Sequence, residues 1–109
     1  MARYLATIEG TTEAFRGFVQ NPEDRKTANQ PLFASLGFDI EHYWFGVGET
    51  NLYLVFTNND DDVDTQALVM AVCASGIVNS MKVSRIMTAE ESVAAMEKAA
   101  SIVYSKPGN

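Results

Sequence analysis

The sequence has one cysteine, one histidine and only 8 basic residues in 109. A single cysteine, Cys73, excludes an internal disulfide, and a reducing cytoplasmic setting is therefore expected. The 14 acidic residues give a net charge of -6, which disfavours nucleic acid and anionic membranes as partners because phosphate binding needs a basic surface. Apolar runs are far shorter than the roughly 20 residues that span a bilayer. Polar residues at Arg3, Thr7 and Glu9 interrupt the N-terminus, so no signal peptide is expected.

Motifs for metal and nucleotide chemistry are also missing. One histidine and one cysteine cannot form a zinc site. The acidic run that starts at Asp60 has Thr65 at position six and Ala71 at position twelve, where a calcium-binding EF-hand needs Gly and Glu. There is no GxGxxG, no Walker loop and no serine-nucleophile elbow. We therefore expect neither a metal nor a cofactor.

The hydrophobic fraction is 47%, which is typical of a globular protein. A chain of this length predicts one domain over residues 1–109, with a core at 3–88 and a C-terminal helix at 89–104. Most of that core is expected to be a small sheet covered by helices.

Residue patterns of period two and short apolar runs predict the strands. In the second strand, strict alternation would place Ile40, His42 and Trp44 on one face. The third strand is apolar on both faces, which indicates a central strand covered on both sides. The strands are expected at residues 3–9, 38–45, 51–57 and 78–86.

Capping residues and glycines mark the helices between these strands. The first helix starts near Thr11, and Asn21 is expected to cap its second part. Pro31 lacks an N–H and is expected to kink or divide that part, which Gly37 then ends. A further helix, capped by Asp61 or Asp62, is almost uniformly apolar over 67–74, so deep burial is expected. Thr88 and Glu91 form a capping box for the last helix.

The element order is β-α-β-β-α-β plus a terminal helix, which predicts an α+β, ferredoxin-like fold with an antiparallel sheet. In this arrangement helices cover only one face of the sheet. The other face would carry apolar residues of the third strand. Exposing a few of these side chains to water would cost several kcal/mol at about 25 cal/mol per Å². We therefore expect a second copy of the chain to cover this face as a homodimer or higher oligomer.

Two segments, FGVGETNLYLVFTNNDD and ALVMAVCASGIVNSMKVSRIMTAEE, resemble the GYD-domain proteins. The resemblance covers most of residues 3–91 and implies a fold of the dimeric α/β-barrel type. Its anchors are Gly48, Asp60, the run 74–76 and the run 88–91. The family has no general assigned reaction, and activities elsewhere in the fold group are only an analogy.

The motif that gives the family its name differs in this chain. If the family glycine aligns with Gly48, Thr50 replaces the usual tyrosine and Asn51 replaces the usual aspartate. An activity that depends on that carboxylate would be lost here, whereas hydrogen bonding by an amide would survive.

His42 is the candidate catalytic residue, because it is the only histidine and its side chain suits acid–base work near neutral pH. If Ile40 faces the helices, alternation places His42 in the cavity between helices and sheet; a packed strand histidine is the simpler alternative. The candidate ligand-binding residues that surround it are Tyr4, Trp44, Asn51, Tyr53 and Arg85.

Two functions remain open from the sequence. The first is a homo-oligomeric small-molecule-binding or assembly module. The alternative is a cofactor-free enzyme of the dimeric α/β-barrel type, an oxygenase or isomerase, in which His42 acts as acid or base and Arg85 or Asn51 steadies an oxyanion. The alternative requires these three side chains to converge within hydrogen-bond reach.

Overall fold

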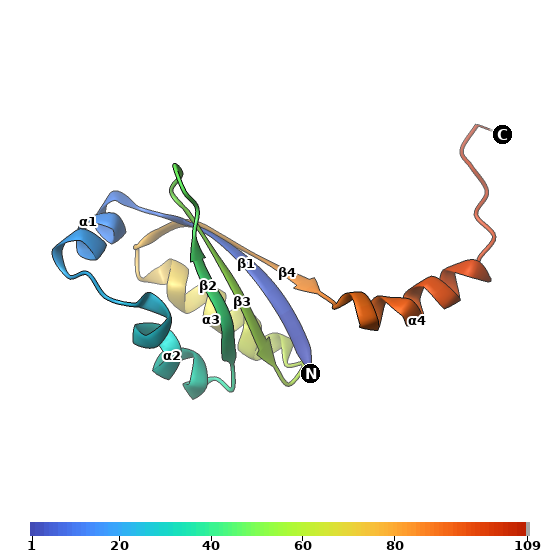
Figure 1. Cartoon of the computed structure of the whole chain (residues 1–109), viewed down its shortest axis with the longest axis horizontal. Coiled ribbons are helices and arrows are strands. Elements are labelled where there is room, and N and C mark those ends of the chain that lie inside the picture. Colours follow the sequence, from blue (N-terminus) through green and yellow to red (C-terminus); the bar gives the residue numbers. More distant parts are fainter. Residues whose placement is uncertain (109) are drawn as a thin grey trace.

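The computed structural model describes residues 1–108 and contains a four-stranded antiparallel sheet with four helices (Figure 1). The strand order is β2-β3-β1-β4, so β1 and β3 are central, as the sequence predicted. The α+β, ferredoxin-like order is confirmed, with an extra helix at the C-terminal end. The elements are β1 Ala2–Gly10, α1 Thr12–Gln20, α2 Arg25–Ser35, β2 Asp39–Phe45, β3 Asn51–Asn58, α3 Asp62–Ala74, β4 Val78–Ile86 and α4 Ala89–Ala100.

The core lies between one face of the sheet and helices α1, α2 and α3. Tyr4 of β1 and Phe56 of β3 stack there with ring centroids 5.6 Å apart. Phe33 of α2 and Leu68 of α3 pack against them and are buried. Aromatic rings dominate this small core, and such pairs add to the stability that burial alone gives.

Side-chain caps define the helix starts. Asp24 accepts hydrogen bonds from the first turn of α2, including Lys26 N at 2.9 Å, so the expected cap at Asn21 is wrong. Pro31 lies inside α2 without dividing it, and Gly37 follows the helix end with a φ of +78°, a conformation that glycine adopts freely. The capping box of Thr88 and Glu91 is confirmed at the start of α4.

Strand β2 contains a β-bulge that the sequence pattern did not predict. Ile40 pairs with Phe56, and His42 pairs with Val55, the next residue along β3. The extra residue, Glu41, shifts the alternation, so Ile40 faces the helices whereas His42 faces the opposite side. The expectation that these two side chains share a face is therefore wrong.

Helix α3 is less buried than its composition suggested. Only Leu68 is buried, while Met70 is 62% exposed and Cys73 is also exposed. The expectation of deep burial over 67–74 is wrong, because α3 lies on the outside of the sheet and presents only one side to it. When a helix is apolar on most sides, its sequence does not show which side packs against the sheet.

Helix α4 extends away from the body of the domain, as Figure 1 shows in orange. It ends at Ala100, before the expected boundary at 104. Val93 and Met96 on this helix are 48% and 65% exposed. The radius of gyration is 17.5 Å, compared with about 13 Å for a compact domain of roughly 100 residues. Within residues 1–108, α4 therefore has an apolar stripe with little to pack against.

Candidate functional site

A pocket of about 280 Å³ opens between the sheet and helices α1, α2 and α3. Its floor comes from all four strands of the sheet, and its walls come from the three helices. Most of its surface is apolar, which is usual for sites that take small molecules. Lining residues include Ile8, Phe18, Leu32, Leu54, Ala71 and Met81.

Four polar side chains line this pocket: Ser75, whose hydroxyl donates to the backbone of α3, and a group formed by Arg25, Asn29 and Tyr43. Arg25 and Asn29 lie one turn apart on α2 and therefore share a helix face. The amide of Asn29 donates to the Tyr43 hydroxyl at 3.4 Å. The β2 bulge turns Tyr43 toward the helices, since Tyr43 pairs with the core residue Leu54.

The Arg25 guanidinium is held at the pocket wall. Its carbon lies 5.7 Å from the centroid of the Phe18 ring, a cation–π contact. Its Nη1 donates to Glu23 Oε1 at 2.5 Å, and Glu23 is itself 41% exposed. The Nε atom is buried and finds no hydrogen-bond acceptor within residues 1–108. A buried donor without a partner costs free energy, so this atom is available for a ligand.

Burial raises the pKa of Tyr43, while the charge of Arg25 and the hydrogen bond from Asn29 act in the opposite direction. Burial dominates because the neutral phenol loses less solvation than the phenolate would. Tyr43 therefore stays a neutral hydrogen-bonding group at physiological pH. The pocket combines one fixed positive charge, one amide, the hydroxyls of Tyr43 and Ser75, and apolar walls.

The opposite face of the sheet carries no helix in the part of the chain that the structure describes, and we call it the open face. The imidazole of His42 stacks on Trp44 there, with ring centroids 4.6 Å apart. Trp44 pairs with Tyr53 across β2 and β3, and it is 53% exposed. Leu5 and Val55 occupy the centre of this face, where they pair across β1 and β3.

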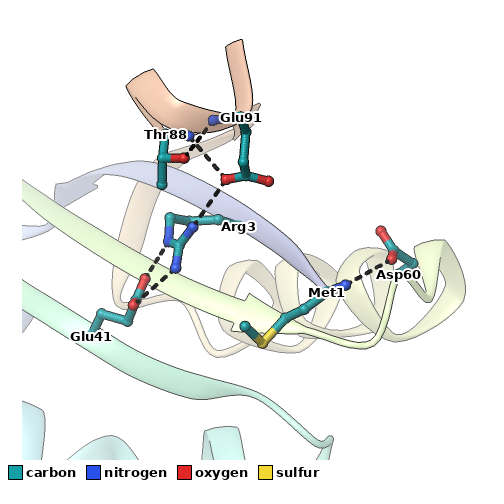
Figure 2. A network of polar contacts seen from close by, with 6 residues as sticks. All are labelled: Met1, Arg3, Glu41, Asp60, Thr88 and Glu91. Carbon is teal, nitrogen blue, oxygen red and sulfur yellow. Dashed lines mark hydrogen bonds and ion pairs between the residues drawn. The ribbon is translucent and has the colours of Figure 1, made fainter. Parts of the chain in front are cut away.

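A charged cluster marks one end of the open face, and Figure 2 shows Arg3 between Glu41 and Glu91. Arg3 Nε donates to Glu41 Oε1 at 2.6 Å, and its Nη1 lies 3.5 Å from Glu91 Oε1. The Glu91 carboxylate also accepts from the backbone N of Thr88 at 3.0 Å. The cluster thus links the base of α4 to β1 and β2.

The structure separates the residues that the sequence grouped into one site. His42, Trp44 and Tyr53 meet on the open face, with Asn51 at its loop end. Tyr4 is buried in the core, and Arg85 binds Asp60 on the surface at 2.6 Å. The expectation that His42 lines the pocket between helices and sheet is wrong, because the bulge reverses its side. The catalytic and ligand-binding roles of these six residues stay predictions.

Sequence reasoning missed Arg25, Asn29 and Tyr43, the polar groups of the pocket. A usable signal was present in α2, where Arg25 and Asn29 continue the same stripe as Leu32 and Phe33 at helical spacing. For Tyr43 the pattern was misleading, because alternation without a bulge assigns it to the wrong face.

No group of three or more His, Cys, Asp or Glu side chains in residues 1–108 is arranged to hold a metal ion. None of the helices in this range has the length and apolar character needed to cross a bilayer.

The fold defines a ferredoxin-like α+β domain with an apolar pocket on one side of its sheet and an open face on the other. A family model described as GYD domain matches residues 4–96. The chain therefore belongs to the GYD-domain family. Comparisons with curated proteins and with solved structures gave no significant match.

Proposed function

We propose that this GYD-domain protein is a homo-oligomeric, cytoplasmic module that binds a small molecule, with two copies joined through the open face. The open face supports this proposal most directly. Leu5 and Tyr53 on it are only half-buried in the single chain, and Trp44 is 53% exposed. Each 100 Å² of such apolar surface removed from water gains about 2.5 kcal/mol of hydrophobic free energy, part of which offsets the entropy that two copies lose on association.

Helix α4 supports association with a second copy independently of the sheet. It leaves the domain at the charged cluster beside the open face, where Glu91 contacts Arg3. Its apolar residues Val93 and Met96 are exposed in the single chain. A helix with an uncovered apolar stripe gains stability when a neighbouring surface covers it. A partner seated on the open face would bring such a surface close to α4.

The mass of the protein in solution tests the assembly proposal. Size-exclusion chromatography with light scattering should give at least a dimer for the wild-type protein. Leu5→Lys places a charge at the centre of the open face and should shift the protein to a monomer. Leu5 is partly exposed in the single chain and lies outside the core, so the monomer should keep its circular dichroism spectrum.

Val63→Lys is the matched control, because Val63 lies on α3 and is 77% exposed. This variant should retain the wild-type mass. A monomeric wild-type protein would reject the assembly proposal. If Leu5→Lys kept the wild-type mass, the copies would be joined by a different surface.

The enzyme alternative has less support from the geometry. It requires His42, Asn51 and Arg85 to converge on one reacting group. His42 is exposed on the open face, whereas Arg85 pairs in register with Tyr4 and binds Asp60. We therefore propose no reaction for this chain.

A further inference from the structure

The pocket between the helices and the sheet has the character of a site for one class of small molecule. We infer that it binds an apolar monocarboxylic acid, whose carboxylate pairs with Arg25 and whose hydrocarbon part lies along the apolar walls. This inference deepens the proposed binding function and depends on it. It concerns the pocket alone, and not the open face.

The charge of Arg25 selects an anion. Its Nε is buried without an acceptor in residues 1–108, and a carboxylate accepts from a guanidinium through two parallel bonds. Glu23 already occupies Nη1 and neutralises part of the charge. Because Glu23 is 41% exposed, water competes for it, and the inner edge of the guanidinium stays available to a ligand.

The Tyr43 hydroxyl and the Asn29 amide complete the polar end of the pocket. They bond to each other at 3.4 Å, and each keeps hydrogen-bonding capacity for one more partner. A carboxylate at Arg25 would accept from the hydroxyl or from the second amide hydrogen. These neutral donors stabilise an anion without introducing a competing negative charge.

The apolar walls determine the rest of the ligand. Leu32 from α2 and Ala71 from α3 lie at the exposed rim, while Leu54 and Phe33 are buried. No acidic side chain is among the residues that line this pocket. A volume of about 280 Å³ lies at the small end of the range for ligand sites, and it suits a medium-chain or single-ring acid.

Calorimetric titration of the full chain with octanoate tests the inference, with octanol as a probe of equal chain length and no charge. Wild-type protein should bind octanoate at least tenfold more tightly than octanol. Arg25→Gln should weaken octanoate binding at least tenfold and leave octanol binding within twofold. Arg25→Lys keeps the charge but loses the paired bonds, so its affinity for octanoate should be intermediate.

Two control variants locate the effect. Arg16→Gln removes an exposed arginine of α1 that does not line this pocket, and it should bind octanoate as the wild type does. Ala71→Trp should fill the rim of the pocket and abolish binding of both probes. Thermal unfolding of each variant shows whether it is folded. If Arg25→Gln is unfolded, the octanoate affinities of Arg25→Lys and the wild type are compared instead, and a lower affinity in Arg25→Lys supports the inference.

The inference is overturned if octanoate fails to bind, or if both probes bind equally and Arg25→Gln changes neither affinity. Light scattering on the same samples keeps the two proposals apart. A dimer that does not bind octanoate contradicts the pocket inference alone. A monomer that binds octanoate through Arg25 contradicts the assembly proposal alone.

Discussion

The guanidinium of Arg3 and the carboxylate of Glu41 meet in a two-bond contact on the open face. Nε lies 2.6 Å from Oε1, and Nη2 lies 3.3 Å from Oε2. Arg3 belongs to β1 and Glu41 to β2, so the contact reaches across β3, which lies between them. Glu41 is the extra residue of the β2 bulge, and this pair therefore holds the residue at which the alternation shifts, so that Ile40 and His42 lie on opposite faces and Tyr43 faces the helices.

This pair predicts a pH dependence of stability. The hydrogen bonds from Arg3 lower the pKa of Glu41 below its usual value of 4.5. A carboxylate with a lowered folded-state pKa stabilises the fold above the unfolded-state pKa, and the contribution is lost as the pH falls through the folded-state value. Glu41→Gln should therefore reduce the free energy of unfolding in urea at neutral pH, and this deficit should shrink well below pH 4.5.

Glu97→Gln on the exposed part of α4 is the control and should match the wild type at both pH values. If Glu41→Gln were as stable as the wild type at neutral pH, the contact between Arg3 and Glu41 would contribute nothing to the free energy of unfolding. A deficit that persists unchanged in acid would point to a cause other than the charge.

The packing of α3 predicts that truncation at two nearby positions lowers the free energy of unfolding by very different amounts. Leu68 is fully buried, and Leu68→Ala should lower the free energy of unfolding by about 2–5 kcal/mol because it leaves a cavity. Met70 is 62% exposed, and Met70→Ala should change it by about 0.5 kcal/mol or less. Urea denaturation measures both. Equal losses at the two positions would mean that α3 is rotated or covered by a partner.

The capping box predicts a local effect confined to α4. Thr88→Ala removes the hydroxyl that accepts from Glu91 N at 3.0 Å, and such a loss costs about 1 kcal/mol of helix stability. Amide hydrogen exchange should become about fivefold faster in α4. Protection in β1 and β3 should not change, since α4 packs little against them. Faster exchange throughout the sheet would contradict the loose attachment of α4.

Tyr43 predicts a loss of stability in alkali. Burial raises its pKa above the usual value of 10.0, so its contribution is complete below that value and is lost as the pH rises through the folded-state pKa. The stability of the wild-type protein should thus fall more steeply above pH 10.0 than that of Tyr43→Phe. Tyr104→Phe, at a position that is 75% exposed, is the control and should follow the wild type.

The sequence predicted several helix ends because these depend on local chemistry, and it predicted the strand order because the order of the elements is that of a ferredoxin-like fold. Thr88 and Glu91 form the expected capping box, and the two-sided apolar pattern of β3 marked a central strand. The faces of β2 could not be predicted, because a bulge depends on contacts such as Arg3 with Glu41 that lie 38 residues apart. The pocket was missed for the same reason, since Tyr43 reaches it only through that bulge.

The orientation of α3 and the position of α4 also escaped prediction. A helix that is apolar all round has no distinct apolar side, so its sequence does not show which side packs. Met70 of α3 is exposed where burial was expected. The stripe of α4 was visible in the sequence, but nothing local says whether its partner is the same chain or another copy.

Sedimentation equilibrium of the wild-type protein at micromolar concentration tests the central claim most directly. The chain has a mass of 11.9 kDa. If a second copy covers the open face, the measured mass should be at least about twice this value and should fall toward it for Leu5→Lys. A wild-type mass that stays at 11.9 kDa across the concentration range would contradict the account.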